Sequence, residues 1–150
     1  MDSPQVSVVM SVYNGERYVA EAIQSILDQT FAQFEFIIVD NDSTDETLNI
    51  IQSFNDSRIK LISNSKNLGQ TGALNVGIRS SSGDFIARID ADDVALSTRL
   101  EKQVEFLNAN PDVSVVGSWA TFIDQDGKEI SDHFVPTDKN EVTLFMSGSP

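Results

Sequence analysis

The sequence predicts an α/β fold of the Rossmann type, with a mainly parallel β-sheet flanked by helices. Three stretches are almost wholly apolar and rich in β-branched residues, as strands buried on both faces of a parallel sheet are: 6–12, 36–39 and 85–89. Between the first two, apolar residues recur at helical spacing over 18–27. An alternation of strands with helices is typical of α/β proteins, so this pattern sets the fold class.

Composition favours one soluble globular domain over residues 1–150. Hydrophobic residues make up 40% of the chain and charged residues 22%, which is the balance of a folded protein. The sequence has no apolar run near the length of a membrane span, no secretory signal pattern at its N-terminus and no cysteine. We therefore expect a cytoplasmic protein, either free or at the inner face of the membrane.

The charge balance limits the possible partners. Ten basic residues against 23 acidic ones give a formal net charge of −13. Binding of nucleic acid needs clustered Lys and Arg, so no nucleic-acid partner is expected. A small anionic ligand is compatible with this charge if a metal ion neutralises the carboxylates around it. His133 is the only histidine, which excludes a site built on two imidazoles.

The elements between the second and third long strands are shorter. Ser43 and Glu46 have the spacing of a capping box, which predicts a helix from there to about Phe54. Ile59 and Leu61 alternate as in a short strand. A glycine-bearing loop then leads into a further helix; the loop covers 64–72 and the helix ends near residue 79.

The last third of the chain is expected to add a helix and two strands. Thr98 and Glu101 repeat the capping pattern, and Asn110-Pro111 ends the helix that they open. Strands are expected over 113–116 and 118–123. Asp126-Gly127 predicts a turn between two β-like segments, and a last helix is expected over 138–145.

Polar residues follow all three long strands. Ligands of open α/β sheets bind outside the carboxyl ends of the strands, which makes these residues the candidate site. They are Tyr13-Asn14-Gly15, Asp40 to Asp45 and Asp90 to Asp93, and the last two groups are acidic.

Two glycine-based phosphate sites are incomplete in this sequence. A dinucleotide site needs three glycines after the first strand, where only Gly15 stands. The glycines at 72 and 77 have the spacing of a phosphate loop, but Ile78 occupies the place of its lysine. A metal held by carboxylates is the expected substitute. Asp90 and Asp92 are separated by one small residue and suit Mg²⁺ or Mn²⁺ bound together with substrate phosphates.

Several short motifs recur in an order and spacing that resembles the family 2 glycosyltransferases, which have the GT-A fold. In order, they are Pro4-x-Val6-Ser-Val8, Tyr13-Asn14-Gly15-Glu16, Gln29-Thr30-Phe31, Ile38-Val39-Asp40, Ser43-Thr44-Asp45, Asn67-Leu68-Gly69, Leu74-Asn75-x-Gly77 and Asp90-Ala91-Asp92-Asp93. The resemblance covers nearly the whole chain. It implies a GT-A-like fold and inverting transfer of a sugar from a nucleotide-diphosphate donor, usually a UDP-sugar, to a saccharide or lipid-linked acceptor.

The resemblance also assigns site residues by position. It places Ser11 and Tyr13 along the nucleoside, and Asn67 in the loop that closes over the base. Asp40 is expected to accept a hydrogen bond from the base. Asp90 is expected near the ribose or the water shell of the metal.

Asp92 is the direct ligand of Mn²⁺ or Mg²⁺ in this assignment. The catalytic base and the acceptor-binding segment of the family are expected beyond residue 150, so the chain is interpreted as a domain truncated at its C-terminus. Where many relatives have Asp-Asp-Gly-Ser-Thr-Asp, this chain has Asp40-Asn-Asp-Ser-Thr-Asp45, so the turn at Asp42 is expected to differ.

Three other classes of protein fit parts of the sequence. The chain could be a non-catalytic nucleotide-binding module, or a fragment that self-associates as a homo-oligomer through an uncovered sheet edge. A haloacid-dehalogenase-like phosphatase also uses an Asp-x-Asp pair. That family carries the pair after its first strand, whereas this chain carries it after the last of its three long strands.

Overall fold

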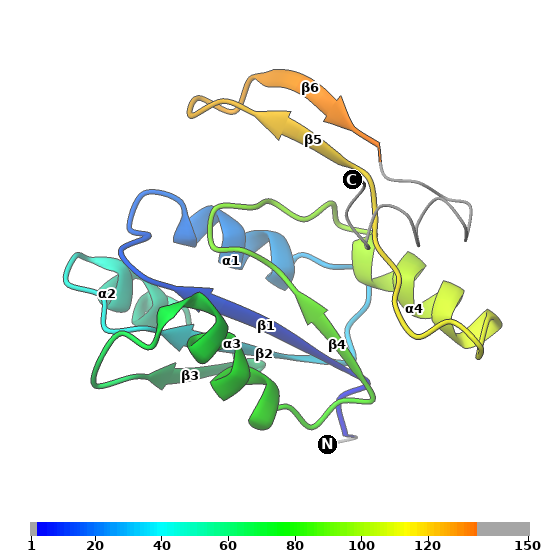
Figure 1. Ribbon diagram of the computed structural model, residues 1–150, viewed down its shortest axis with the longest axis horizontal. Coiled ribbons are helices and arrows are strands. Elements are labelled where there is room, and N and C mark those ends of the chain that lie inside the picture. Colours follow the sequence, from blue (N-terminus) through cyan, green and yellow to red (C-terminus); the bar gives the residue numbers. More distant parts are fainter. Residues whose placement is uncertain (1–2, 135–150) are drawn as a thin grey trace, which may run out of the picture. The chain divides into compact units, whose positions relative to one another are not determined.

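The computed structural model describes residues 3–134. The sequence predicts one domain. The contacts within the chain instead divide it into two compact units, Met1–Val104 and Glu105–Pro150. The first unit holds a four-stranded sheet with helices, and the second holds a two-stranded sheet (Figure 1).

All four strands of the first sheet are parallel, and their order across the sheet is β3-β2-β1-β4. They are β1 (Val6–Val12), β2 (Phe34–Asp40), β3 (Ile59–Ser63) and β4 (Phe85–Arg88). The predicted α/β fold with a parallel sheet is therefore confirmed. β1 lies inside the sheet between β2 and β4, and every residue of β2 is buried, as their apolar sequences predict.

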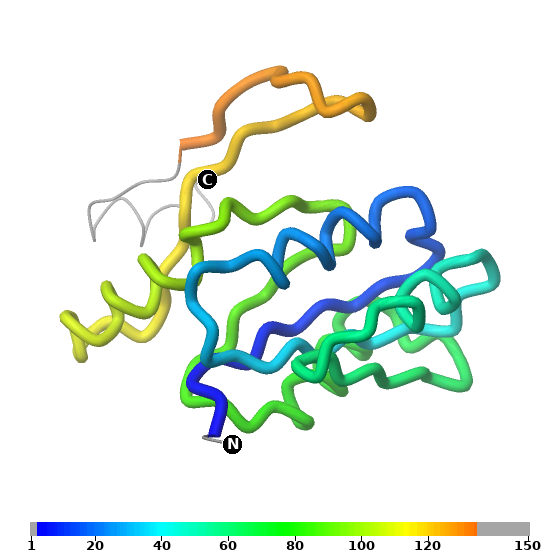
Figure 2. The backbone as a smooth tube through the Cα atoms, turned by 180° about the vertical axis from the view of Figure 1, so that it is seen from behind, coloured from blue at the N-terminus to red at the C-terminus, as the bar shows by residue number. Residues whose placement is uncertain are grey.

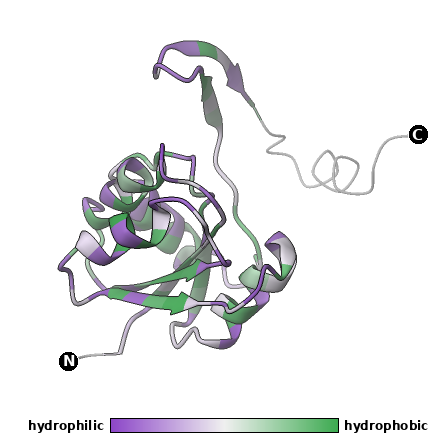
Figure 3. Cartoon of the chain, turned by 90° about the vertical axis from the view of Figure 1, so that its left-hand side faces the viewer, coloured by the Kyte–Doolittle hydropathy of each residue, from purple (hydrophilic) through white to green (hydrophobic). Residues whose placement is uncertain are grey.

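Helices cover both faces of this sheet. They are α1 (Val19–Leu27), α2 (Thr47–Ser53), α3 (Gly69–Arg79) and α4 (Arg99–Ala109). Residues of α1, α2 and the start of α4 form one core cluster with β1 and β2, whereas α3 packs on the other face through Ala73. Figures 1 and 2 show α1 and α3 on opposite sides of the β1–β2 pair, and Figure 3 shows the strands largely in the colour of hydrophobic residues.

Most element boundaries lie close to those predicted, but the capping box at the start of α2 is wrong. The helix begins at Thr47, and no side chain caps it by a hydrogen bond at its N-cap, Glu46. Asp45 Oδ1 instead accepts the N–H of Thr47 at 3.0 Å. Ser43 Oγ accepts a hydrogen bond from the N–H of Asn14, in the neighbouring loop, at 3.0 Å.

Smaller differences affect the other elements of the first unit. β2 begins two residues before the apolar run, because buried Phe34 pairs with Val6 of β1. α3 begins at Gly69 rather than after Gly72, and β4 ends one residue early, at Arg88.

The described part of the second unit contains the end of α4, a stretch without regular secondary structure and a two-stranded sheet. The strand predicted over 113–116 is absent there, since these residues have no strand partner and are mostly exposed. β5 (Ala120–Ile123) and β6 (Glu129–His133) pair in antiparallel fashion around the predicted turn, where Gly127 has a φ of 78°. The helix predicted over 138–145 lies outside the described residues. No helix in the part of the chain that the structure describes is long and apolar enough to cross a membrane.

A buried carboxylate joins three segments at the end of the sheet where β1 and β2 begin. Glu35 of β2 accepts hydrogen bonds from Ser7 Oγ at 2.6 Å and from the N–H and hydroxyl of Ser82 at 2.7 and 2.8 Å. It also forms an ion pair with Lys60. Burial raises the pKa of Glu35, but Lys60, Ser7 and Ser82 together outweigh it and lower the pKa from 4.5 to about 2.

This network predicts an acid-dependent loss of stability. A carboxylate whose pKa is lower in the folded than in the unfolded protein stabilises the fold above its unfolded pKa and loses this contribution as pH falls. We expect Glu35→Gln to lower the free energy of unfolding near neutral pH, and the difference from wild type to shrink between pH 4.5 and about 2. Denaturant unfolding across this range measures it, with exposed Glu21→Gln as the control. A difference that does not change with pH would contradict the prediction.

Candidate functional site

The candidate site lies where the order of strands reverses. From β1 the chain moves outward through β2 to β3, and it then returns to the other side of β1 for β4. Ligands of open α/β sheets bind at such a switch point, outside the carboxyl ends of the strands. Tyr13 follows β1 and Asp90 lies two residues after β4, so both lie at this end of the sheet.

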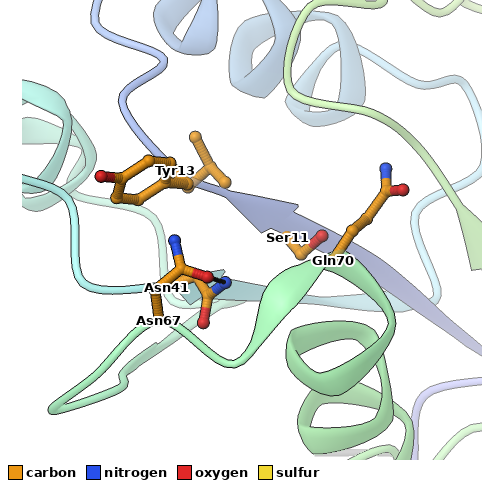
Figure 4. Close-up of a pocket in the computed structure, with 6 residues that line it drawn as sticks. Ser11, Tyr13, Asn41, Asn67 and Gln70 are labelled. Carbon is orange, nitrogen blue, oxygen red and sulfur yellow. Dashed lines mark hydrogen bonds between the residues drawn. The ribbon is translucent and has the colours of Figure 1, made fainter.

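A cavity of about 360 Å³ opens at this end of the sheet. The residues that line it carry no charge, and all but one valine are polar. They are Ser11, Val12, Tyr13, Asn41, Asn67 and Gln70 (Figure 4). The structure thus brings together three residues predicted from the sequence, Ser11, Tyr13 and Asn67. Tyr13 is 52% exposed, so its ring is available to a planar ligand.

The cavity is on the side of the sheet that α3 covers. Gly77 allows this helix to lie close, because a Cβ at that position would come within 2.5 Å of Val9 Cγ1. Since alternate residues of a strand face opposite sides, Ser11 shares the face of Val9. The close packing of α3 places Gln70, in its first turn, beside the end of β1.

Asp40 is separated from the cavity, although it directly precedes Asn41. It has the strand parity of Ile38, whose side chain belongs to the core cluster on the α1 side of the sheet. Asp40 is 3% exposed and does not line the cavity. Its buried Oδ1 makes no hydrogen bond to any described residue. Buried polar atoms normally have a hydrogen-bond partner. This oxygen is therefore the atom of Asp40 through which the predicted hydrogen bond from a ligand would be made.

The loops that follow β1 and β2 hold each other in place. Thr44 N–H donates to Asn14 Oδ1 at 2.8 Å, and Gly15 N–H donates to Thr47 Oγ1 at 2.8 Å. Two left-handed residues shape the turns, Asn14 with a φ of 51° and Asp42 with a φ of 70°. Glycine adopts a left-handed φ more readily than aspartate does, so the expected effect of Asp42 on this turn stays a prediction.

Of the three carboxylates in the acidic loop after β4, that of Asp90 forms an ion pair and that of Asp92 does not. Arg88 Nη2 binds both oxygens of Asp90, at 2.6 and 2.7 Å. Asp92 is exposed and makes no hydrogen bond or ion pair to another described residue. Burial raises the pKa of Asp93, and the neighbouring charges of Asp90 and Asp92 raise it further.

This donor set suits a divalent metal that is shared with a ligand. Within residues 3–134, no group of three or more acidic, His or Cys side chains could hold a metal by itself. Mg²⁺ and similar ions are usually bound through one or two carboxylates together with substrate phosphates and water. The unpaired carboxylate of Asp92 fits that arrangement, and Asp90 is the second candidate if Arg88 releases it.

Three residues at this end of the sheet were missed by the sequence analysis: Asn41, Gln70 and Arg88. The period of two along β2 is the signal that could have identified Asn41, since it places residue 41 rather than residue 40 on the α3 side. Gln70 and Arg88 carry no comparable signal, because their positions follow from the start of α3 and the end of β4.

The chain is similar to known proteins over most of its length. The model of Glycosyl transferase family 2 matches residues 7–146. A glycosyltransferase of Methanocaldococcus jannaschii is 44% identical over 131 residues, which cover 85% of this chain and 45% of the relative. WfgD of Escherichia coli, a UDP-Glc:alpha-D-GlcNAc-diphosphoundecaprenol beta-1,3-glucosyltransferase, is 40% identical over 73% of this chain and 44% of its own length. The chain therefore spans about half the length of the curated relatives it matches.

Solved structures show the same likeness. TarS of S. aureus in complex with UDP superposes with a TM-score of 0.67 at 31% identity, over 71% of this chain and 33% of that one. A mannosyltransferase of Pyrobaculum calidifontis, in complex with GDP-Man and Mn²⁺, has a TM-score of 0.67 at 27% identity, over 74% of this chain and 34% of its own.

Proposed function

Because the chain belongs to glycosyltransferase family 2, we propose that the cavity and the acidic loop together form the donor site of an inverting, metal-dependent glycosyltransferase. The proposed donor is a UDP-sugar, in line with the UDP complex of TarS. One observation carries the proposal: the uncharged polar cavity beside β1 and the unpaired carboxylate after β4 flank the same switch point. A nucleotide needs these two environments, one for its base and one for its diphosphate.

Each residue then has a role in binding. Tyr13 packs against the base and Ser11 hydrogen-bonds the nucleoside, both from the cavity. A contact between Asp40 and the base stays a prediction of the sequence, because this side chain is buried on the α1 side of the sheet and does not line the cavity. Asp92 holds Mn²⁺ or Mg²⁺, and Asp90 contacts the ribose or the water shell of the metal. When bound, the metal stabilises the charge that develops on the departing diphosphate.

The acceptor side is proposed from the family. WfgD is named for transfer to a lipid-linked GlcNAc-diphosphoundecaprenol, which supports a saccharide or lipid-linked acceptor here. The catalytic base and the acceptor contacts are proposed to lie outside residues 1–150. Formation of a homo-oligomer stays a prediction of the sequence.

Calorimetric titration of UDP into the full chain tests the donor site, first with Mn²⁺ and then with EDTA. We expect binding that is clearly tighter with Mn²⁺, and weak binding of uridine that does not depend on the metal. Equal UDP affinity with Mn²⁺ and EDTA would remove the metal from the proposal. No binding under either condition by a folded protein would contradict the whole donor-site assignment.

A further inference from the structure

Arg88, the last residue of β4, holds the first carboxylate of the acidic loop with a single nitrogen atom. Its Nη2 lies 2.6 Å from Oδ1 of Asp90 and 2.7 Å from Oδ2. A carboxylate that binds a divalent cation through both of its oxygens holds the ion between them in the same way. The guanidinium of Arg88 therefore occupies the cation-binding side of Asp90 within the loop that is proposed to hold the metal.

This ion pair lies on the side of the sheet where the cavity opens. Arg88 is the register partner of Val9 of β1, and partners in parallel strands point to the same side. Val9 shares that side with Ser11, which lines the cavity. The residue between the paired arginine and aspartate is Ile89, whose side chain is buried in the core cluster on the α1 side. Arg88 and Asp90 thus face the same side of the sheet as the cavity.

The backbone of Arg88 is held firmly, whereas its side chain is held only by Asp90. Its carbonyl accepts a hydrogen bond from Arg99 Nη2 at 2.8 Å, and the N–H of Ile89 donates to the carbonyl of Val9 at 3.2 Å. The side chain is 55% exposed, and Asp90 is its one ion-pair partner among the described residues. An exposed ion pair contributes little to stability, because water solvates both charges. The guanidinium can therefore leave Asp90 at small cost while β4 stays in place.

Binding of a metal and a diphosphate would change the charges around Arg88. A divalent cation at the acidic loop repels the guanidinium, and a diphosphate attracts it. We propose that Arg88 exchanges partners: it neutralises Asp90 in the free protein, and it pairs with the diphosphate of the donor when the metal is bound. A guanidinium suits both partners, because carboxylates and phosphates accept its hydrogen bonds equally well. The inference rests on the proposed donor site.

The exchange predicts two effects of opposite sign when the charge of Arg88 is removed. In Arg88→Gln, Mn²⁺ no longer competes with a guanidinium, so without a nucleotide it should bind more tightly, by up to about fivefold. At saturating Mn²⁺ the same variant lacks a charge-assisted hydrogen bond to the diphosphate, so UDP should bind about tenfold more weakly. Loss of a merely structural residue would weaken both ligands or neither.

The first measurement is titration of Mn²⁺ alone into the full chain, followed by the electron paramagnetic resonance signal of the free ion. The second is calorimetric titration of UDP, and of uridine, at a Mn²⁺ concentration that saturates every variant. Uridine has no phosphate and should bind wild type and Arg88→Gln equally. Arg88→Lys keeps one positive nitrogen, which is what Asp90 contacts now, so its affinity for Mn²⁺ should stay near that of wild type.

Arg79→Gln is the matched control. Arg79 is also exposed, and it is the last residue of α3, whereas Gln70 of the cavity lies in the first turn of that helix. A helix of 11 residues is about 16 Å long, so this charge is remote from the site and screened by salt. The variant loses the same charge as Arg88→Gln and should leave both affinities within about twofold of wild type.

The outcomes separate this inference from the donor site itself. If wild type binds UDP with Mn²⁺, but Arg88→Gln binds Mn²⁺ no more tightly or UDP no more weakly, the inference is overturned and the donor site stands. Equal shifts in Arg79→Gln would reveal a general effect of net charge and would overturn it as well. Wild-type protein that binds no UDP overturns both. If Arg88→Gln does not fold, Arg88→Met decides by the same two affinities, because it also removes the charge.

Discussion

Asp92→Asn is expected to abolish the part of UDP binding that depends on metal. The substitution keeps the size of the side chain but removes its carboxylate. Asp92 is the exposed member of the Asp90–Asp92 pair, and Arg88 binds Asp90 instead of it. Removing even an outer-shell partner of a metal typically costs 10–100-fold in affinity, so loss of the proposed direct ligand should weaken UDP by roughly 100-fold in Mn²⁺. Titration with EDTA should give the same weak affinity for the variant and for wild type.

Asp84→Asn provides a matched control for this prediction. Asp84 is also exposed, and it directly precedes β4, whereas Asp92 follows that strand. Both variants change the net charge equally, so a general effect of charge on an anionic ligand would appear in both. Equal loss of UDP affinity in the two variants, or an unchanged affinity of Asp92→Asn in Mn²⁺, would show that Asp92 is not the ligand.

Gly83→Ala is expected to destabilise the first unit severely. A Cβ at this position would lie 2.7 Å from the backbone N of Ser7 and 2.8 Å from the backbone carbonyl carbon of Val6. Backbone atoms of a strand inside the sheet cannot move aside as a flexible side chain can. The shift would also disturb the hydrogen bond from Gly83 N–H to Ser7 Oγ, which itself donates to Glu35. We expect a loss of roughly 3 kcal/mol in the free energy of unfolding.

Thermal and denaturant unfolding measure this loss, which corresponds to a fall in Tm of more than about 10 °C. Gly117→Ala is the control, because a Cβ there meets nothing within 4 Å and the residue has no left-handed φ. It should change stability by no more than about 0.5 kcal/mol. A Gly83→Ala variant as stable as the Gly117→Ala variant would mean that β1 can shift to make room.

The parallel sheet could be predicted because its cause is local. β1 and β2 are buried on both faces, so almost every residue in them is apolar and the pattern needs no knowledge of the partner strand. The run at 113–116 shows the limit of that argument. It contains three valines, but a strand also needs a hydrogen-bonding partner, and none lies beside it in the described chain.

The site was harder to predict because its contacts connect distant parts of the sequence. The sequence identified the end of β2 as a ligand position. Asn41 lines the cavity and Asp40 does not, because the two side chains lie on opposite sides of the sheet and the cavity is on the side of Asn41. The hydrogen bonds of Asn41 reach a segment 23 to 28 residues away. Ser43 likewise matched a capping box, but its oxygen is used by a residue 29 positions earlier. Local patterns carry no information on such competing partners.

The mutual bonds between the loops after β1 and β2 have a consequence for the entropy of binding. Glu16 N–H donates to Asp45 at 3.2 Å, and Glu46 N–H donates to Glu16 at 3.0 Å, in addition to the contacts of Asn14 and Gly15. Each loop thus loses its freedom when the chain folds, before any ligand arrives. Ordering loops at the moment of binding would subtract from the affinity, and preorganised loops avoid this cost. The wall of the cavity can therefore accept a small ligand with little loss of conformational entropy.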